Sequence, residues 1–235
     1  MNLCVIPARG GSKRIPRKNI RDFCGKPMIA YAIQVAIDSG LFSVIIVSTD
    51  DEEIASISRK YGAQTPFLRP ANLSDDHTPT VPVIAHAISF GISQGWQFDD
   101  VCCIYPGCPF LEPQDLRSAF QALHASKASY SFPVAEYPSS IQRALKMGKN
   151  GALGSFFPEY QLTRTQDLEK SYFDAGQFYW GRKSAWLDGR TIHSDGIGLV
   201  LPKWRVVDID EEQDWRKAEF FFHALEGGKD EQSNI

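Results

Sequence analysis

Residues 2–19 read Asn-Leu-Cys-Val-Ile-Pro-Ala-Arg-Gly-Gly-Ser-Lys-Arg-Ile-Pro-Arg-Lys-Asn. The first five residues form an apolar run, closed by Pro7, that is typical of a strand buried on both faces. A loop with paired glycines and five basic residues between positions 9 and 18 follows. Glycines let backbone N–H groups turn toward an anion, and basic side chains add charge. The stretch therefore predicts a phosphate site at the end of a strand.

Apolar runs of the same character return at 44–47 and 101–105, and the segments between and after them show helical spacing. The helical positions are Ile29, Ile33 and Ala36; Ile54 and Ile57; Ile84, Ile88 and Ile92; and Leu116, Phe120 and Leu123. Strands that alternate with helices predict an α/β fold whose mainly parallel sheet carries helices on both faces. Ligands of such sheets bind at the carboxyl ends of the strands, where the basic loop lies.

The segment from about 136 to 172 interrupts this alternation. Pro138, Gly148, Gly151, Gly154 and Pro158 punctuate it, and no long amphipathic helix fits. We expect it to leave the sheet as an excursion from a single domain that spans residues 1–235. A strand pattern resumes at 172–180, and a last helix is expected to begin after Asp210.

The composition is that of an ordinary globular protein, with 235 residues, 43% of them hydrophobic and 23% charged. A net charge of −3 argues against a general nucleic-acid binder. No apolar stretch is long enough to span a bilayer and no signal peptide is visible, so we expect a cytoplasmic protein with no membrane contact. The five cysteines show neither zinc spacing nor a disulfide framework, and Cys108 stays open as a nucleophile.

The basic loop matches neither the P-loop pattern nor the dinucleotide-binding pattern Gly-x-Gly-x-x-Gly. Kinase and dehydrogenase functions therefore lose their main support. The alternative for the loop is a solvated basic surface with no ligand.

Four motifs together resemble a known family. The run Pro-Ala-Arg-Gly-Gly-Ser-Lys-Arg-Ile-Pro-Arg-Lys-Asn-Ile is followed by Gly25-Lys-Pro27, Ser48-Thr-Asp-Asp51 and Arg69-Pro70. Over nearly the whole chain the sequence resembles the cytidylyltransferases that activate nonulosonic acids such as sialic acid. The resemblance implies a Rossmann-like nucleotidyltransferase fold. It also implies CTP and a nine-carbon sugar acid as substrates, with a CMP-sugar and pyrophosphate as products.

The resemblance places the CTP site on the basic loop. The implied contacts are Arg9, Gly10, Gly11, Ser12, Lys13, Lys18, Asn19 and Arg69. Arg9 and Lys18 are also expected to be catalytic, because attack on the α-phosphorus builds negative charge that fixed cations stabilise. The alternative for Arg69 is a surface arginine before a proline turn.

Asp208 and Asp210 form the second informative pair. If residues 206–209 are strand-like, the two carboxylates share one face, where they can bind a Mg²⁺ ion that also meets the triphosphate. We therefore expect both residues to be metal ligands and catalytic. The alternative makes Asp210 the N-cap of the last helix.

Three further residues are expected to bind the sugar. Arg164, in Thr163-Arg-Thr-Gln-Asp167, resembles a family arginine and could grip the sugar carboxylate, with a loop ion pair as the alternative. Asp174 and Gln177 lie in Asp174-Ala-Gly-Gln-Phe-Tyr-Trp180, where sialic-acid enzymes usually carry Asn-Gly-Ala-Ile-Tyr. Tyr105 stands where those enzymes show Gln. These differences resemble family members that act on pseudaminic acid, a sugar with a second acylamino group and a 9-deoxy end.

The sequence leaves other substrates open. Sialic, legionaminic or Kdo-type acids are alternatives, as is a non-catalytic nucleotide-sugar binding module. The acidic pair beside a basic loop favours an enzyme, because phosphoryl transfer needs both and a binding module does not. The family also implies a homodimer that forms through the excursion, which carries apolar residues such as Tyr137, Phe156 and Tyr160.

Overall fold

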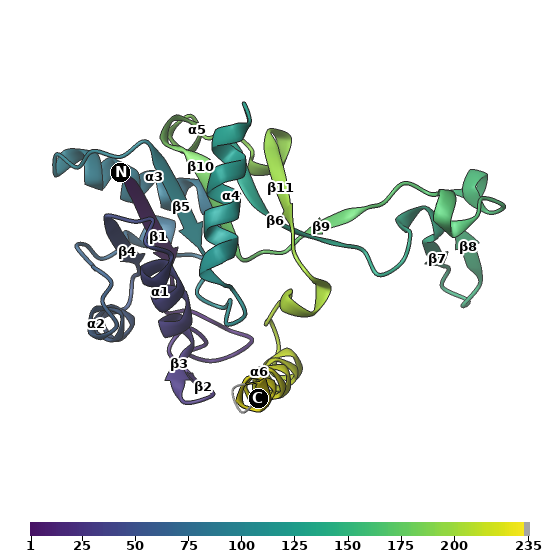
Figure 1. The fold of residues 1–235 in the computed structure, drawn as a ribbon, viewed down its shortest axis with the longest axis horizontal. Helices are drawn as coiled ribbons and strands as arrows, with labels where there is room; N and C mark the ends of the chain where they lie inside the picture. The colour runs from purple at the N-terminus through teal and green to yellow at the C-terminus, as the bar shows by residue number, and fades with distance from the viewer. Residues whose placement is uncertain (233–235) are drawn as a thin grey trace.

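The computed structural model describes residues 1–232, with side chains described through residue 225. Its centre is a mixed sheet in the order β11-β6-β10-β5-β1-β4 (Figure 1). The strands are β1 (Asn2–Pro7), β4 (Val44–Ser48), β5 (Asp100–Ile104), β6 (Tyr130–Glu136), β10 (Phe178–Arg182) and β11 (Gly196–Val200). β1 pairs in parallel with β4 and β5, and β11 with β6, whereas β10 runs antiparallel between β5 and β6. The predicted α/β fold with a mainly parallel sheet is confirmed.

Helices cover both faces of the sheet. They are α1 (Met28–Ser39), α2 (Glu52–Lys60), α3 (Thr80–Ser93), α4 (Pro113–Ala125) and α5 (Lys183–Leu187). Alternate residues of β1 point to opposite faces: Cys4 and Ile6 pack with α1, α2 and α4, and Leu3 and Val5 pack with α3 and α5. Both faces of the strand are thus buried, as the continuous apolar run predicts.

The single strand expected at 172–180 is wrong. The structure has β9 (Tyr172–Asp174), which pairs antiparallel with β6, and then β10 after a break. Gly176 lies at φ +63° in this break, a left-handed conformation that favours glycine. Asp174 and Phe178 therefore belong to different strands.

The segment between β6 and β9 leaves the sheet as a long arm that projects from the body (Figure 1). Its far end holds the hairpin of β7 (Leu145–Met147) and β8 (Leu153–Ser155). Many apolar side chains in it are exposed, among them Ile141, Leu145, Met147, Leu153, Phe156, Phe157 and Leu162. This arm is the excursion predicted at 136–172.

The last helix, α6 (Glu212–Gln232), packs on the basic loop and the short hairpin of β2 (Asp22–Phe23) and β3 (Lys26–Pro27). Trp215 is fully buried against Phe23, and Ile15 and Ile209 belong to the same apolar cluster. The cluster therefore brings the chain near residue 209 against the loop after β1. Among the described residues, no helix combines the length and apolar character needed to cross a membrane.

Candidate active site

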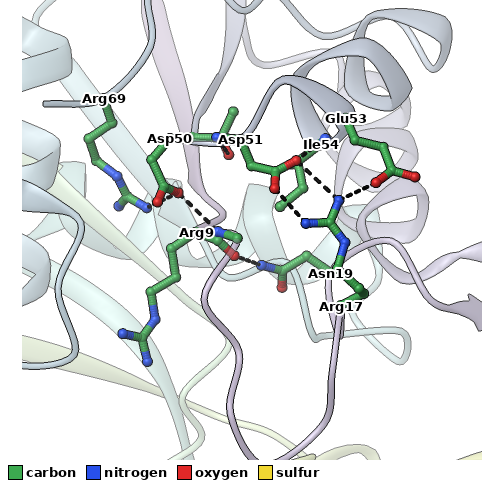
Figure 2. Close-up of polar contacts among 10 residues, drawn as sticks. Arg9, Arg17, Asn19, Asp50, Asp51, Glu53, Ile54 and Arg69 are labelled. Carbon is green, nitrogen blue, oxygen red and sulfur yellow. Dashed lines mark hydrogen bonds and ion pairs between the residues drawn. The ribbon is translucent and has the colours of Figure 1, made fainter. Parts of the chain in front are cut away.

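The basic loop is folded by the two carboxylates that follow β4. The Gly10 N–H donates to Asp50 at 2.9 Å, and the Asp51 carboxylate binds the Arg17 guanidinium at 2.5 and 3.1 Å (Figure 2). A Cβ on Gly10 would lie 2.7 Å from the Asp51 carboxylate, so this close approach requires glycine. The hydrogen bonds from Arg17, together with the cap of α2, lower the pKa of Asp51. Arg17 thus anchors the loop and does not face the ligand space.

The loop encloses a pocket of about 430 Å³ at the carboxyl end of β1. It is lined by Pro7, Arg9, Ser12, Lys13, Arg14, Lys18, Asn19, Asp76, Pro106 and Asp210. Five of the residues predicted to bind CTP, together with Asp210, therefore meet in one cavity. Asn19 braces this wall: its side-chain amide donates to the Arg9 carbonyl at 2.9 Å, and its backbone carbonyl accepts from Ile29 at 2.8 Å. Gly10 and Gly11 lie in the same loop, but the Gly10 N–H is already bound to Asp50.

Asp76 balances the positive charge of the pocket, a role that no sequence motif predicts. Its carboxylate forms ion pairs with both Arg9 and Lys13, which hold its pKa below the ordinary value. The neighbouring Asp75 accepts hydrogen bonds from His77 and Thr78 and so folds the turn that presents Asp76. An anionic ligand of the pocket must compete with this carboxylate for the same cations.

The acidic pair lies beside the basic loop. Lys18 Nζ donates to the Ile209 carbonyl at 2.5 Å and lies 3.6 Å from Asp210 Oδ1, and Arg14 pairs with Asp210 at 2.9 Å. Residues 206–210 are irregular and form no strand, so that expectation is wrong. The alternation nevertheless holds locally, because Ile209 is buried between the more exposed Asp208 and Asp210.

The alternative role for Asp210, as N-cap of the last helix, is also wrong. α6 begins at Glu212, so Glu211 stands at the N-cap position, and Asp214 accepts from the backbone N–H groups of Asp210 and Glu211 in the reciprocal bond of a capping box. The carboxylate of Asp210 therefore stays directed to the basic loop. Burial, and then the charge of Asp210, raises the pKa of Asp208. Two carboxylates that disfavour each other's charge suit a shared divalent cation. Within the described residues, no group of three or more His, Cys, Asp or Glu could hold a metal by itself.

Arg69 lies behind the loop with unused hydrogen-bonding capacity. Its side chain is 5% exposed and lies 3.9 Å from Asp50, on the side of that residue away from Arg17 (Figure 2). Burial lowers its pKa, and Nε and Nη2 find no hydrogen-bond partner in the described chain. A buried guanidinium whose Nε and Nη2 make no hydrogen bond fits a ligand contact better than a surface role.

Gln177, expected to bind the sugar, is 3% exposed, and its amide donates to the Arg205 carbonyl at 2.8 Å. Arg205 in turn binds Asp115 through both terminal nitrogens at 2.8 and 2.9 Å, at the start of α4. This buried network ties the segment that precedes Asp208 to the body of the protein. In this structure Gln177 therefore helps to hold the segment that leads to Asp208 and Asp210.

A second pocket has a volume of about 460 Å³. It is lined by Pro79, Thr80, Val81, Pro82, Tyr105, Tyr179, Gly189, Arg190, Thr191, Ile192 and His193. Neighbouring residues of the chain belong to the two pockets, because Pro106 lines the first and Tyr105 the second. Tyr105 bonds Thr80 at 2.5 Å, and burial raises its pKa to about 12. Asp174 lies behind this wall, since its carboxylate accepts from Tyr179 at 2.8 Å and contacts His193 at 2.6 Å.

Two other residues lie away from these pockets. Arg164 belongs to the arm, where its carbonyl begins a single helical turn, so one chain does not bring it to the basic loop. Cys108 is buried and its thiol donates to the Tyr105 carbonyl at 2.8 Å. Burial raises its pKa to about 12, which opposes the nucleophile considered for this position.

Comparison with known proteins identifies the family to which this chain belongs. The cytidylyltransferase family model matches residues 3–152. The chain is 44% identical over 222 residues to a pseudaminic acid cytidylyltransferase of Campylobacter jejuni subsp. jejuni serotype O:23/36 (strain 81-176), covering 94% of this chain and 96% of that protein. It is 39% identical over 223 residues to a CMP-N,N'-diacetyllegionaminic acid synthase of Legionella pneumophila subsp. pneumophila (strain Philadelphia 1). This match covers 92% of this chain and 94% of that protein.

Among solved structures, the fold is similar to a CMP:2-keto-3-deoxy-manno-octonic acid synthetase complexed with CTP. The TM-score is 0.69 at 14% identity, over 95% of this chain and 99% of that one. The relation at this identity is one of fold. The motif resemblance described for the sequence is confirmed by the family model and the relatives, and the chain belongs to the cytidylyltransferase family.

Proposed function

We propose that this protein transfers CMP from CTP to pseudaminic acid and releases pyrophosphate. The observation that carries the proposal is the basic pocket at the end of β1, with Asp210 in its wall beside Lys18 and Asp208 two residues earlier in the chain. The choice of sugar rests on similarity over nearly the full length to a relative named for pseudaminic acid. The relative named for diacetyllegionaminic acid makes that acid the second candidate.

The reaction forms a bond between a sugar hydroxyl oxygen and the α-phosphorus and breaks the bond from that phosphorus to the β-phosphate oxygen. Negative charge grows on the α-phosphate oxygens and on the departing pyrophosphate. Arg9, Lys13 and Lys18 line the pocket that would hold this charge, and ion pairs with Asp76 or Asp210 place them there. Fixed cations stabilise the transition state without reorganisation, so Arg9 and Lys18 are the proposed catalytic cations.

The remaining CTP contacts are proposed from the same loop and from Arg69. Gly10 and Gly11 let the backbone pass close to the triphosphate, and Ser12 and Asn19 offer hydrogen bonds on the pocket wall. The unpaired N–H groups of buried Arg69 would donate to a phosphate or a base oxygen. Its burial makes each of these bonds worth more than at the surface.

Mg²⁺ is proposed as the cofactor, held by Asp208 and Asp210. Burial, and then the charge of Asp210, raises the pKa of Asp208, and a divalent cation would stabilise both carboxylates in their charged form. The bound ion would neutralise charge on the triphosphate.

The second pocket is proposed to hold the sugar, because Tyr105 in its wall directly precedes Pro106 of the first pocket, and because it combines apolar walls with tyrosine hydroxyls. Asp174 lies behind its wall, and the Gln177 amide donates to the Arg205 carbonyl. Arg164 would reach a sugar only from the arm of a second copy. We propose that the arm forms a homodimer contact, since it exposes Leu145, Phe156 and other apolar side chains. A cytoplasmic location is proposed for the same enzyme.

The decisive experiment measures CMP-sugar and pyrophosphate formation from CTP, with and without Mg²⁺. Pseudaminic, N,N'-diacetyllegionaminic, N-acetylneuraminic and Kdo acids are supplied in parallel. We expect the largest kcat/KM with pseudaminic acid and no turnover after chelation. Equal activity on N-acetylneuraminic acid would refute pseudaminic acid as the preferred substrate. Turnover without a divalent ion would refute Mg²⁺ as the cofactor. Binding of CTP without turnover of any acid would favour the alternative function, a non-catalytic nucleotide-sugar binding module.

A further inference from the structure

Three side chains form a hydrogen-bonded group at the edge of the second pocket. Asp174 Oδ2 accepts from the Tyr179 hydroxyl at 2.8 Å and lies 2.6 Å from His193 Nε2, while Asp174 Oδ1 accepts from the Gly176 N–H at 2.8 Å. Tyr179 and His193 both line the pocket, and Asp174 lies behind them with its side chain 24% exposed. The carboxylate is therefore occupied by the protein itself, and His193 is the member of the group that remains 60% exposed.

The partners decide which nitrogen of His193 carries the proton. An ionised carboxylate only accepts hydrogen bonds, so the Nε2 that faces Asp174 must be the N–H in the neutral imidazole. Tyr179 does not compete for that role, because burial, together with the charge of Asp174, raises its pKa and keeps it a phenol that donates. In the neutral ring Nδ1 is then an acceptor, and it makes no hydrogen bond to any residue that the structure describes.

The ring plane is also fixed. His193 packs edge-on against Phe132, with ring centroids 5.3 Å apart and planes at 85°. Its backbone lies in the short turn Ile192–Ser194, whose Ile192 is buried. A ring held by a hydrogen-bond partner on one side and an aromatic ring on another presents Nδ1 in a defined direction.

We propose that His193, oriented by Asp174, is a specificity-determining residue that accepts a hydrogen bond through Nδ1 from an acylamino N–H of the sugar acid. The inference rests on the proposed function and refines it. An amide N–H is a donor only, so a fixed acceptor matches it, and a sugar that carries hydrogen at that position would leave Nδ1 without a partner. Asp174 then acts as a positioning residue through His193, and does not itself touch the sugar.

The test compares His193→Phe and His193→Asn with the wild type, under saturating CTP and Mg²⁺. Phenylalanine keeps the ring and its packing on Phe132 but has no acceptor, so KM for the acylamino sugar should rise about three- to tenfold with kcat and KM for CTP unchanged. Asparagine offers Oδ1 near the position of Nδ1 and should recover part of this loss. An analogue with the recognised acetamido group replaced by hydrogen should show the same KM with wild type and His193→Phe.

A second comparison isolates Asp174. Asp174→Asn should raise KM for the sugar in the wild-type background and have no further effect in the His193→Phe background, because its influence passes through the ring. Equal KM for wild type and His193→Phe, additive effects in the double variant, or a parallel rise in KM for CTP would overturn the proposal. A wild type that makes no CMP-sugar from any acid would instead refute the proposed function, and the inference with it.

Discussion

Asp208 and Asp210 are the residues whose charge the proposed reaction uses most directly. Asp208→Asn and Asp210→Asn keep the shape of each side chain but remove a hard anionic ligand, so we expect kcat to fall at least about a hundredfold. Steady-state turnover with CTP and the preferred acid measures this loss. Asp214→Asn is the matched control, because Asp214 serves the start of α6 and should affect thermal stability more than turnover. Wild-type turnover in both site variants would refute the proposal that Asp208 and Asp210 bind Mg²⁺.

Asp76 is expected to weaken nucleotide binding in the wild type. Its ion pairs with Arg9 and Lys13 must be broken when the triphosphate enters. Asp76→Asn should therefore lower the Kd for CTP about two- to fivefold at low ionic strength. Calorimetric titration without sugar acid measures the change, and Asp38→Asn, an exposed carboxylate on α1, is the control. A weaker affinity in Asp76→Asn would show that Asp76 belongs to the ligand's own contacts.

The pair of Arg17 with Asp51 makes stability depend on pH. Because Arg17 lowers the pKa of Asp51, the pair stabilises the fold above the unfolded-state pKa near 3.8, and the contribution is lost as pH falls through the lower folded value. Asp51→Asn keeps an acceptor for the cap of α2. We expect it to lower the free energy of unfolding by about 1 kcal/mol at pH 6. Chemical denaturation across pH should show the two proteins converging toward pH 3, and a difference independent of pH would contradict this account.

At the scale of elements, a buried ion pair between Arg205 and Asp115 helps to hold the segment 201–210. Arg205→Met would leave Asp115 without its partner at the start of α4, and a buried carboxylate stranded in this way costs about 3–5 kcal/mol of stability. Urea unfolding measures the loss. Lys170→Met breaks the exposed pair with Glu136 and should change stability little. Equal effects in the two variants would mean that Arg205 does not anchor the segment.

The elements differ in how far the sequence alone could define them. β1, β4 and β5 follow from apolar runs, and α1 to α4 follow from helical spacing, because burial alone determines both patterns. The break at Gly176 could not be found in this way, since alternation across 172–180 is the same whether one strand or two are present. The choice depends on which strands β9 and β10 pair with, and pairing is non-local.

The candidate site shows the same division. Arg9, Lys13 and Lys18 share one loop, so a local motif found them together. Asp76 and Arg205 meet their partners across 63 or more positions of chain, with no motif around either. The polarity of Gln177 predicts a sugar contact, but its amide is buried and donates to the Arg205 carbonyl. A sequence pattern does not say whether an amide faces a ligand or a backbone carbonyl.

At the scale of the whole molecule, the arm predicts assembly. Phe156→Glu places a charge among its exposed apolar residues and should convert a homodimer to a monomer, because a buried unpaired charge costs more than the contact provides. Light scattering at micromolar concentration measures the mass. Phe220→Glu, on exposed α6, should leave the dimer intact. A wild-type protein that is monomeric at this concentration would refute the proposed homodimer.

The antiparallel strand β10 lies between β5 and β6, yet it follows both in the chain. A ribosome therefore delivers β1, β4, β5 and β6 well before the strand that joins the two halves of the sheet. Until residue 182 has emerged, β6 has no place beside β5, and both strands present unpaired edges. We expect the nascent chain to gain protease resistance in one late step, after β10 is synthesised, with the arm already outside the closing sheet.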